Sequence, residues 1–176
     1  NGTQASGGPP IGAEIHAMAF SFNSPDSALA NTVFVNYSVR NYSPNNYHDF
    51  YLSVFMDSDI GDAYDDYVGS DSSLSLGYGY NGNASDLNYG SKCPAQGFLA
   101  LNSPMSSFIY FNNGMTFTPV IDADYYNMMT GKMIDGSPYT VGGVGYGGSI
   151  PTKYVFSGNP ANPSEWSELS AGNLPG

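Results

Sequence analysis

Half of the aspartates in this chain, six of twelve, fall in the fifteen-residue segment 57–71, which contains no Lys or Arg. The whole chain has only four basic residues. Two carboxylates about 4 Å apart repel by roughly 1 kcal/mol in water, and by several times that near a protein surface. The segment therefore folds only if its carboxylates splay into solvent, take up protons or share a cation.

Calcium is the cation that this segment suits best, because calcium takes six to eight oxygen ligands and short acidic loops with glycine at the bends supply them. The spacing is not that of an EF-hand, since Gly61 stands at the fifth position of the pattern and Val68 at the twelfth. Zinc prefers His or Cys, and magnesium keeps more waters. We therefore predict bound Ca²⁺ with ligands drawn from six carboxylates: Asp57, Asp59, Asp62, Asp65, Asp66 and Asp71.

A solvated acidic loop is the simpler alternative for the same segment. Apolar and aromatic residues, among them Ile60, Tyr64 and Tyr67, are interleaved with the acids. They favour a packed segment, in which the carboxylates come closer together and a cation is needed more.

Composition excludes several classes of partner. The net charge is −11 and the pI is about 4.1, so nucleic acid and anionic membrane surfaces are poor partners. No apolar run is long enough to insert into a membrane. Charged residues make up only 11% of the chain, whereas Tyr occurs fifteen times. Such a surface is typical of secreted proteins and suits contacts with proteins or carbohydrate.

The clearest strand pattern covers residues 32–41, with Val33, Val35, Tyr37 and Val39 on one face and Asn36, Ser38 and Arg40 on the other. The alternation resumes over residues 48–56 with Phe50, Leu52 and Val54 on one side. We expect these two strands to pair as a hairpin through the turn at 42–47 and to bury both apolar faces in the core.

Further short strands are expected at residues 14–22, 73–80, 97–102, 107–112 and 152–157, with frequent turns between them. Residues 122–130 are the one helix candidate, with Asp122 expected to cap its start and Gly131 to end it. This pattern predicts an all-β protein, a β-sandwich or jelly-roll-like fold with long loops and at most one short helix. Residues 1–12 are expected to be a flexible or exchanged tail, and residues 13–176 a single β-rich domain.

Catalytic machinery is hard to find in the chain. Cys93 is the only cysteine, and nothing ties it to His16 or His48. The glycine loop 141–148 is followed by Pro151 and lacks the helix that a phosphate-binding loop requires. A glycosidase acts through two carboxylates at a set separation, and the sequence does not give the separation of any two aspartates. We expect no enzyme activity and no catalytic residue.

Eight short motifs stand in order along the chain: Pro9–His16, Asp57–Asp62, Asp65–Gly69, Gly77–Gly82, Pro94–Gly97, Ser107–Asn113, Gly142–Gly147 and Trp166–Asn173. Together they resemble a region of large secreted and surface proteins of Bacteroidetes, which are exported by type IX secretion and are largely uncharacterised. The chain departs from that pattern at Ser70, where the family has Cys, and at Met133, where it has Trp.

The resemblance implies an extracellular or cell-surface location. The family continues beyond the position of Gly176, so the chain is expected to be a fragment of a longer protein. Asp26-Ser27-Ala28 resembles the short O-glycosylation motif of Bacteroidetes, which makes Ser27 a candidate for glycosylation.

Three functions follow as expectations. The first is a non-catalytic structural or adhesion module stabilised by calcium, with itself, other surface proteins or polysaccharide as partners. The second is a self-assembling subunit of an extracellular filament or sheath. The third is a polysaccharide-binding or glycoside-hydrolysing domain.

Overall fold

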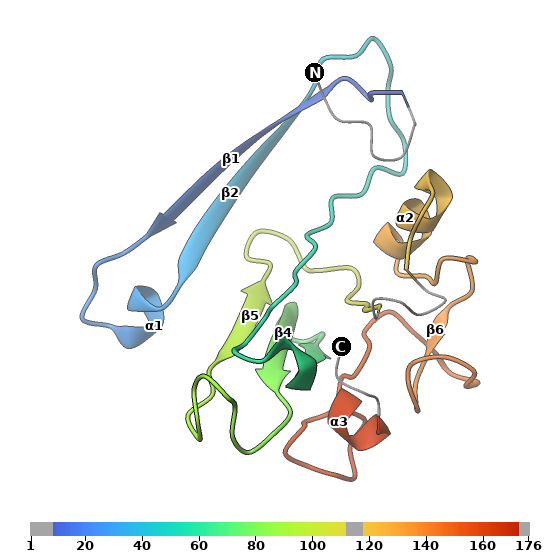
Figure 1. The fold of residues 1–176 in the computed structure, drawn as a ribbon. Coiled ribbons are helices and arrows are strands. Elements are labelled where there is room, and N and C mark those ends of the chain that lie inside the picture. The colour runs from blue at the N-terminus through green and yellow to red at the C-terminus, as the bar shows by residue number, and fades with distance from the viewer. Residues whose placement is uncertain (1–8, 112–117, 173–176) are drawn as a thin grey trace. The chain divides into compact units, whose positions relative to one another are not determined.

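The computed structural model describes residues 9–111 and 118–172, and its contacts divide the chain into two compact units, residues 1–50 and residues 51–176 (Figure 1). Within the described residues the strands form three separate antiparallel sheets of two, three and two strands. The expected all-β class with long loops is confirmed. The part of the chain that the structure describes contains three short helices, where the sequence suggested one at most.

The N-terminal unit is built on a long hairpin of β1 (Ala13–Ser21) and β2 (Val33–Asn41). All nine residues of β1 pair with β2, and Ala17 opposite Tyr37 is the central pair. The one-turn helix α1 (Ser27–Ala30) lies between the two strands in the chain, and the Asp26 side chain caps it by accepting the Ala28 N–H. The expected strand at 14–22 is thus confirmed.

The expected pairing of residues 32–41 with residues 48–56 is wrong. β2 pairs with β1 instead, and residues 48–56 form no strand. Asp49 has a φ of 51°, in the left-handed region, which interrupts the extended run that the alternation suggested. Residues 1–8 of the expected tail lie outside the described residues. Gly12 is tied to the hairpin end, since its carbonyl accepts the Tyr42 N–H.

The side chains that we expected in the core are exposed. Fractional exposure is 68% for Val33, 46% for Val35, 44% for Tyr37 and 36% for Val39. Phe50, Leu52 and Val54 are also exposed. Among the described residues the sheet of β1 and β2 has only these two strands. The alternation of residues 32–41 identifies a face of this sheet correctly, but the side chains on that face stay exposed.

The C-terminal unit contains the sheet of β3 (Asp66–Asp71), β4 (Leu76–Asn81) and β5 (Ala95–Leu99), in that order. Its other elements are the 3₁₀ turn η1 (Ala63–Asp65), the helix α2 (Asp122–Met129), the short strands β6 (Tyr139–Thr140) and β7 (Pro151–Thr152), and the one-turn helix α3 (Glu168–Ala171). The expected helix is α2. β4, β5 and β7 overlap the strands expected at 73–80, 97–102 and 152–157.

The strand expected at 107–112 is reduced to a single bridge between Phe108 and Tyr154, and Asn112 lies outside the described residues. Phe108 also explains a glycine in β4. A Cβ atom on Gly77 would lie 2.3 Å from the Phe108 ring, so only glycine lets this ring pack against the strand.

The core of the C-terminal unit consists of Met133, Tyr139, Val155 and Phe156, with Trp166 packed against it. Val155 and Phe156 are fully buried. Ser70 in β3 joins the sheet to this core, because its N–H donates to the Phe156 carbonyl and its hydroxyl to the Val155 carbonyl. The Phe156 and Trp166 rings lie 5.5 Å apart.

We expect Phe156→Ala to destabilise the C-terminal unit by about 3–5 kcal/mol, because it removes a fully buried ring. Urea unfolding followed by the fluorescence of Trp166, the only tryptophan, measures this directly. Leu87→Ala is the control, since Leu87 is 85% exposed and should change stability by no more than about 0.5 kcal/mol. A loss below about 1 kcal/mol for Phe156→Ala would contradict the assignment of the core.

Candidate functional site

Backbone N–H groups donate hydrogen bonds to several carboxylates of the acidic segment. Asp66 opens β3, and its Oδ2 atom accepts the Ile60 N–H at 2.6 Å. Its other oxygen, Oδ1, is buried and has no hydrogen-bond partner among the described residues. Burial raises the pKa of Asp66, and the nearby charges of Asp65, Asp59 and Asp86 act in the same direction, against the lowering effect of the Ile60 N–H. Asp66 is thus where the segment's like charges concentrate.

Asp86 holds the acidic segment to the following loop, although the sequence did not single it out. It is 4% exposed, and its carboxylate accepts N–H groups from Asp62 at 2.8 Å, Asn88 at 2.7 Å and Tyr89 at 2.6 Å. Burial alone would raise the pKa of Asp86, but these backbone donors outweigh it and the pKa is lowered. An aspartate two residues before an asparagine and four before a glycine is a turn signal that would have located it.

The contact of Asp86 also explains Gly61. Gly61 has a φ of 84°, and a Cβ atom there would lie 2.3 Å from Asp86 Oδ1. Glycine is required by both the backbone conformation and the space. The glycine that suggested a calcium loop therefore serves a carboxylate–backbone contact.

The other predicted ligands are spread over the segment. Asp57 and Asp59 are exposed in a stretch without regular structure. Asp62 caps η1 by accepting the Tyr64 N–H, and the two oxygens of Asp65 accept the side-chain amides of Asn81 and Asn83.

Asp71 ends β3 and caps the turn that follows it. Its Oδ1 atom accepts the Ser73 hydroxyl, and the Ser73 and Leu74 N–H groups. These bonds, the Ser73 hydroxyl first, lower the pKa of Asp71. Asp66 and Asp71 stand at opposite ends of a six-residue strand, roughly 16 Å apart along its axis. No single ion binds both, so the six predicted ligands do not form one site. Among them, Asp62 donates its N–H to Asp86, and the charges of Asp59, Asp65 and Asp86 act on Asp66.

The described residues contain no group of three or more His, Cys, Asp or Glu side chains arranged to hold a metal ion. Cys93 is half-buried, and its thiol donates to the Gly90 carbonyl. Ser27, the glycosylation candidate, is the first residue of α1 and its side chain is exposed.

The second candidate site is the face of the hairpin that carries the exposed side chains, which we call the apolar hairpin face. Residues that alternate along a strand share a face, and the register places two sets together: Ala13, Ile15, Ala17, Ala19 and Ser21 with Val33, Val35, Tyr37, Val39 and Asn41. None of these ten residues is charged. The opposite face is apolar only near α1, where the rings of Phe20, Phe22 and Phe34 contact one another.

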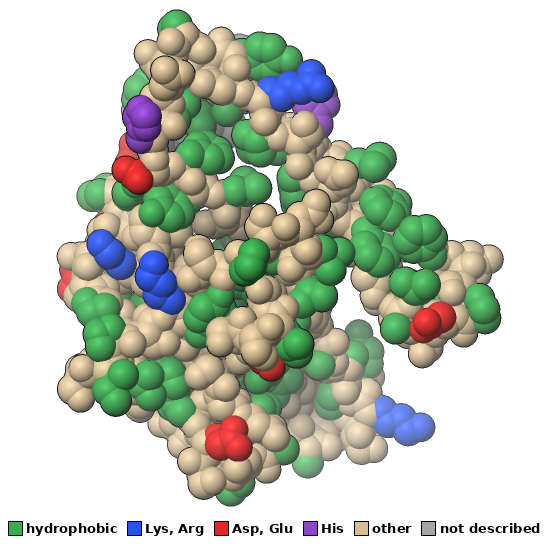
Figure 2. Space-filling model, turned by 180° about the vertical axis from the view of Figure 1, so that it is seen from behind, with side chains coloured by type: hydrophobic (Ala, Val, Ile, Leu, Met, Phe, Trp, Pro, Cys, Tyr) green, Lys and Arg blue, Asp and Glu red, His purple; other side chains and the backbone are tan. Residues whose placement is uncertain are grey.

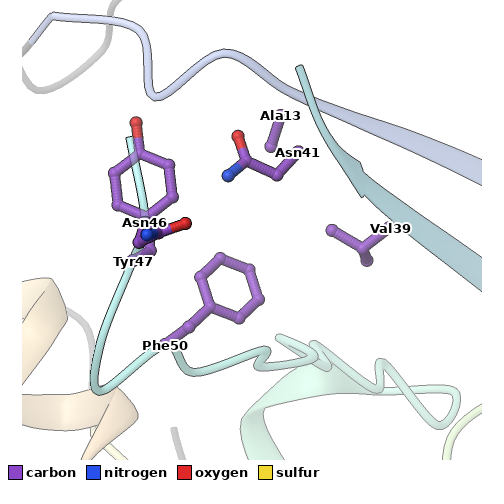
Figure 3. A pocket seen from close by; sticks show the side chains of 6 residues that line it. All are labelled: Ala13, Val39, Asn41, Asn46, Tyr47 and Phe50. Carbon is purple, nitrogen blue, oxygen red and sulfur yellow. The ribbon is translucent and has the colours of Figure 1, made fainter. Parts of the chain in front are cut away.

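A hollow of about 380 Å³ lies at the Ala13 end of the apolar hairpin face (Figure 3). Ala13, Val39 and Asn41 line it from the strands, and Asn46, Tyr47 and Phe50 line it from the segment after β2. The Tyr47 hydroxyl donates to the Ile11 carbonyl at 2.6 Å, which holds its ring in place. The hollow is mostly apolar, with amide groups at its margin.

Hydrophobic side chains are frequent on the surface in Figure 2, whereas Lys and Arg are few. Residues 1–50 carry three acids and one base, and residues 51–176 carry twelve acids and three lysines. The two units therefore contribute −2 and −9 to the net charge of −11. Within the part of the chain that the structure describes, no helix is both long and apolar enough to cross a bilayer.

Comparisons of the chain with protein-family models, with curated proteins and with solved structures found no match. Function must therefore be argued from the acidic segment and the apolar hairpin face themselves.

Asp66 and Asp71 should affect the pH dependence of stability with opposite signs. The pKa of Asp66 is raised, so its ionisation costs stability as the pH rises through that pKa. The pKa of Asp71 is lowered, so its ionised form contributes stability that is lost as the pH falls. As the pH rises from 3 to 7, Asp66→Asn should gain stability relative to the parent chain, by no more than about 1 kcal/mol. Over the same range Asp71→Asn should lose stability relative to the parent chain.

Melting curves of both variants and the parent chain, recorded across that pH range, test this expectation. Asp66→Asn keeps an oxygen that accepts the Ile60 N–H, so the comparison isolates the charge. Parallel pH profiles for the two variants would contradict the assigned environments.

Proposed function

We propose that this chain is a non-catalytic association module of a secreted or cell-surface protein. The observation that supports it best is the apolar hairpin face, whose uncharged side chains, apart from the half-buried Ala13, are exposed along a hairpin of nine residue pairs. Monomeric proteins rarely expose large contiguous apolar patches, and such patches mark interaction sites. The partner is another copy of the chain, another surface protein or a polysaccharide.

The chemistry of the acidic segment fits a supporting role in this module. Asp62, Asp65 and Asp86 are engaged with backbone or amide N–H groups, which fix the loop before β3. A carboxylate held in this way is an acceptor in a rigid loop. It is a poor general base, because its lone pairs are in use and, for Asp86, its pKa is lowered.

Calcium is proposed as the stabiliser of this loop. Asp66 supports the idea, since its buried Oδ1 atom lacks a partner among the described residues and like charges surround it. A hard cation beside Asp66 would remove that repulsion and supply the missing contact. Asp59 and Asp65, whose charges raise the pKa of Asp66, are the nearest acids that would share the ion.

If calcium binds there, millimolar calcium should raise the melting temperature relative to EDTA. At free calcium a hundredfold above the dissociation constant, binding adds about 2.7 kcal/mol. Asp59→Ala and Asp66→Asn should abolish the difference, whereas Asp135→Asn, which removes an acid from the turn after α2, should leave it intact. Identical melting curves in EDTA and in calcium would refute the proposal, and elemental analysis of the purified chain gives an independent reading.

A polysaccharide-binding function is the second candidate, and the hollow of Figure 3 favours it. Tyr47 and Phe50 present ring surfaces beside the amide of Asn46. Rings with polar groups at their margin suit a sugar, whose faces are apolar and whose edges carry hydroxyls.

One set of experiments separates these functions. Sedimentation velocity tests self-association, affinity electrophoresis in a panel of polysaccharides tests binding, and reducing-end release tests hydrolysis. We expect association in at least one of the first two and no hydrolysis. Tyr47→Ala should weaken retardation if the hollow binds sugar. Hydrolysis that is lost in Asp65→Asn or Asp66→Asn would overturn the non-catalytic proposal, and so would the absence of any association.

A further inference from the structure

We infer that two copies of this chain pair through the apolar hairpin face, related by a two-fold axis that crosses the strands at the Ala17–Tyr37 pair. The inference rests on the proposed association function and names its partner. It converts each exposed hairpin into one layer of a two-layer β structure.

The hairpin needs a second layer for stability. An isolated two-stranded hairpin is marginal in water, and a third strand or a packed layer is normally required. β1 and β2 are the only strands of their sheet among the described residues, yet they hold nine residue pairs in register. The face that would receive a layer is already marked by side-chain type, with β-branched Ile15, Val33, Val35 and Val39.

Charge favours a second copy over a charged partner. The apolar hairpin face carries no charge, so two such faces meet without a desolvated ion. The N-terminal unit contributes only −2 of the net charge, whereas residues 51–176 contribute −9. The face thus belongs to the unit that carries little of the charge.

The shape of the face selects the orientation. A two-fold interface is self-complementary, so a projection at one position must meet a depression at its symmetry mate. Val33 lies four residues from Tyr37 toward α1. At 68% exposed, it projects further into solvent than the other three apolar side chains that β2 contributes to this face. The hollow bordered by Ala13 and Asn41 lies four residues from the central pair in the other direction.

A two-fold axis through the central pair consequently places Val33 of each copy over the hollow of the other, against Tyr47 and Phe50. If the two α1 ends met instead, the hollows would face each other and leave a void. Voids of that kind lose packing contacts on every wall.

The size of the face sets the expected strength. The face is about 30 Å long, because each strand has nine residues, and about 10 Å wide. Together with the walls of the hollow, the two copies would bury about 1,000 Å² of accessible surface in total. Stable interfaces usually bury about 1,200–2,000 Å². We expect a reversible dimer with a dissociation constant of roughly 1–100 µM, seen at high concentration and lost on dilution.

Sedimentation equilibrium of the chain between about 1 and 500 µM tests the pairing. Val35→Asp should raise the dissociation constant at least about tenfold, since each copy then places an unpaired carboxylate in the interface. Asn36→Asp adds the same charge on the opposite face of the same strand and should change the constant less than about threefold. Val33→Asp is the second interface variant if Val35→Asp fails to fold.

Disulfide cross-linking in a Cys93→Ser background tests the orientation. Ala17→Cys lies at the axis and should cross-link to its own copy. Val33→Cys lies roughly 14 Å from the axis and should not, but it should cross-link when mixed with Asn41→Cys, which lies four residues from Tyr37 in the other direction on the same strand. Cross-linking of Val33→Cys to itself would overturn the two-fold arrangement.

The remaining outcomes distinguish this inference from the broader proposal. A chain that stays monomeric at 500 µM but is retarded by a polysaccharide overturns the pairing and leaves the association function standing. Equal weakening by Val35→Asp and Asn36→Asp also overturns it, because a different surface then mediates association. A monomer that Val35→Asp strongly destabilises would mean that residues 51–176 cover the face, which overturns it as well.

Discussion

Backbone N–H groups take the place of cations throughout the acidic unit. Ile60 donates to Asp66, three residues donate to Asp86, and Val68 donates to the buried Glu168 across a separation of one hundred residues. With four Lys and Arg for fifteen acids, ion pairs are not an available solution for most carboxylates. Charge-assisted hydrogen bonds from amides are about twice as strong as neutral ones, and they fix the backbone that donates them. The irregular loops of this unit are held by its acids.

The N-terminal unit follows another rule. It has few charges, and its regularity comes from an antiparallel ladder whose apolar face stays exposed. The two units therefore differ in charge and in surface. Residues 51–176 contribute −9 of the net charge of −11, and the hairpin of residues 13–41 carries an uncharged face. The apolar hairpin face and the acidic loop need not touch for both to contribute.

The sequence predicted the elements with strong periodicity and failed where two signals competed. The alternation of residues 32–41 predicts β2, and the strand expected at 14–22 is β1. The expected helix α2 begins at Asp122, but the side chain of Asp124, and not that of Asp122, accepts the N–H groups that precede it. Residues 48–56 alternate equally well, but the left-handed Asp49 interrupts them, and no composition rule reveals that conformation. The partner of β2 is therefore not the alternating segment that follows it but β1, which precedes it in the chain.

The acidic segment shows the same limit at the site. The density of aspartates in this segment indicated a loop. The structure instead forms the short strand β3 there, with Tyr67, Val68 and Ser70 between Asp66 and Asp71. Asp86 was missed because it stands alone in a polar loop, and only the fold brings it to Asp62. The alternation along residues 32–41 correctly predicts which side chains share a face. It does not predict that this face is buried, because burial requires a second layer that alternation alone does not indicate.

The register of the hairpin has a mechanical consequence. Ala13 and Asn41 are paired at the same end of the ladder, and both chain connections leave from that end. Tension applied through the chain would therefore load the residue pairs one after another, as a zipper opens, instead of shearing all nine together. The hairpin would yield at low force and close again when the force is released. Within a stretched surface protein it would lengthen early, while a layer packed across its face would couple the pairs and raise the force at which it opens.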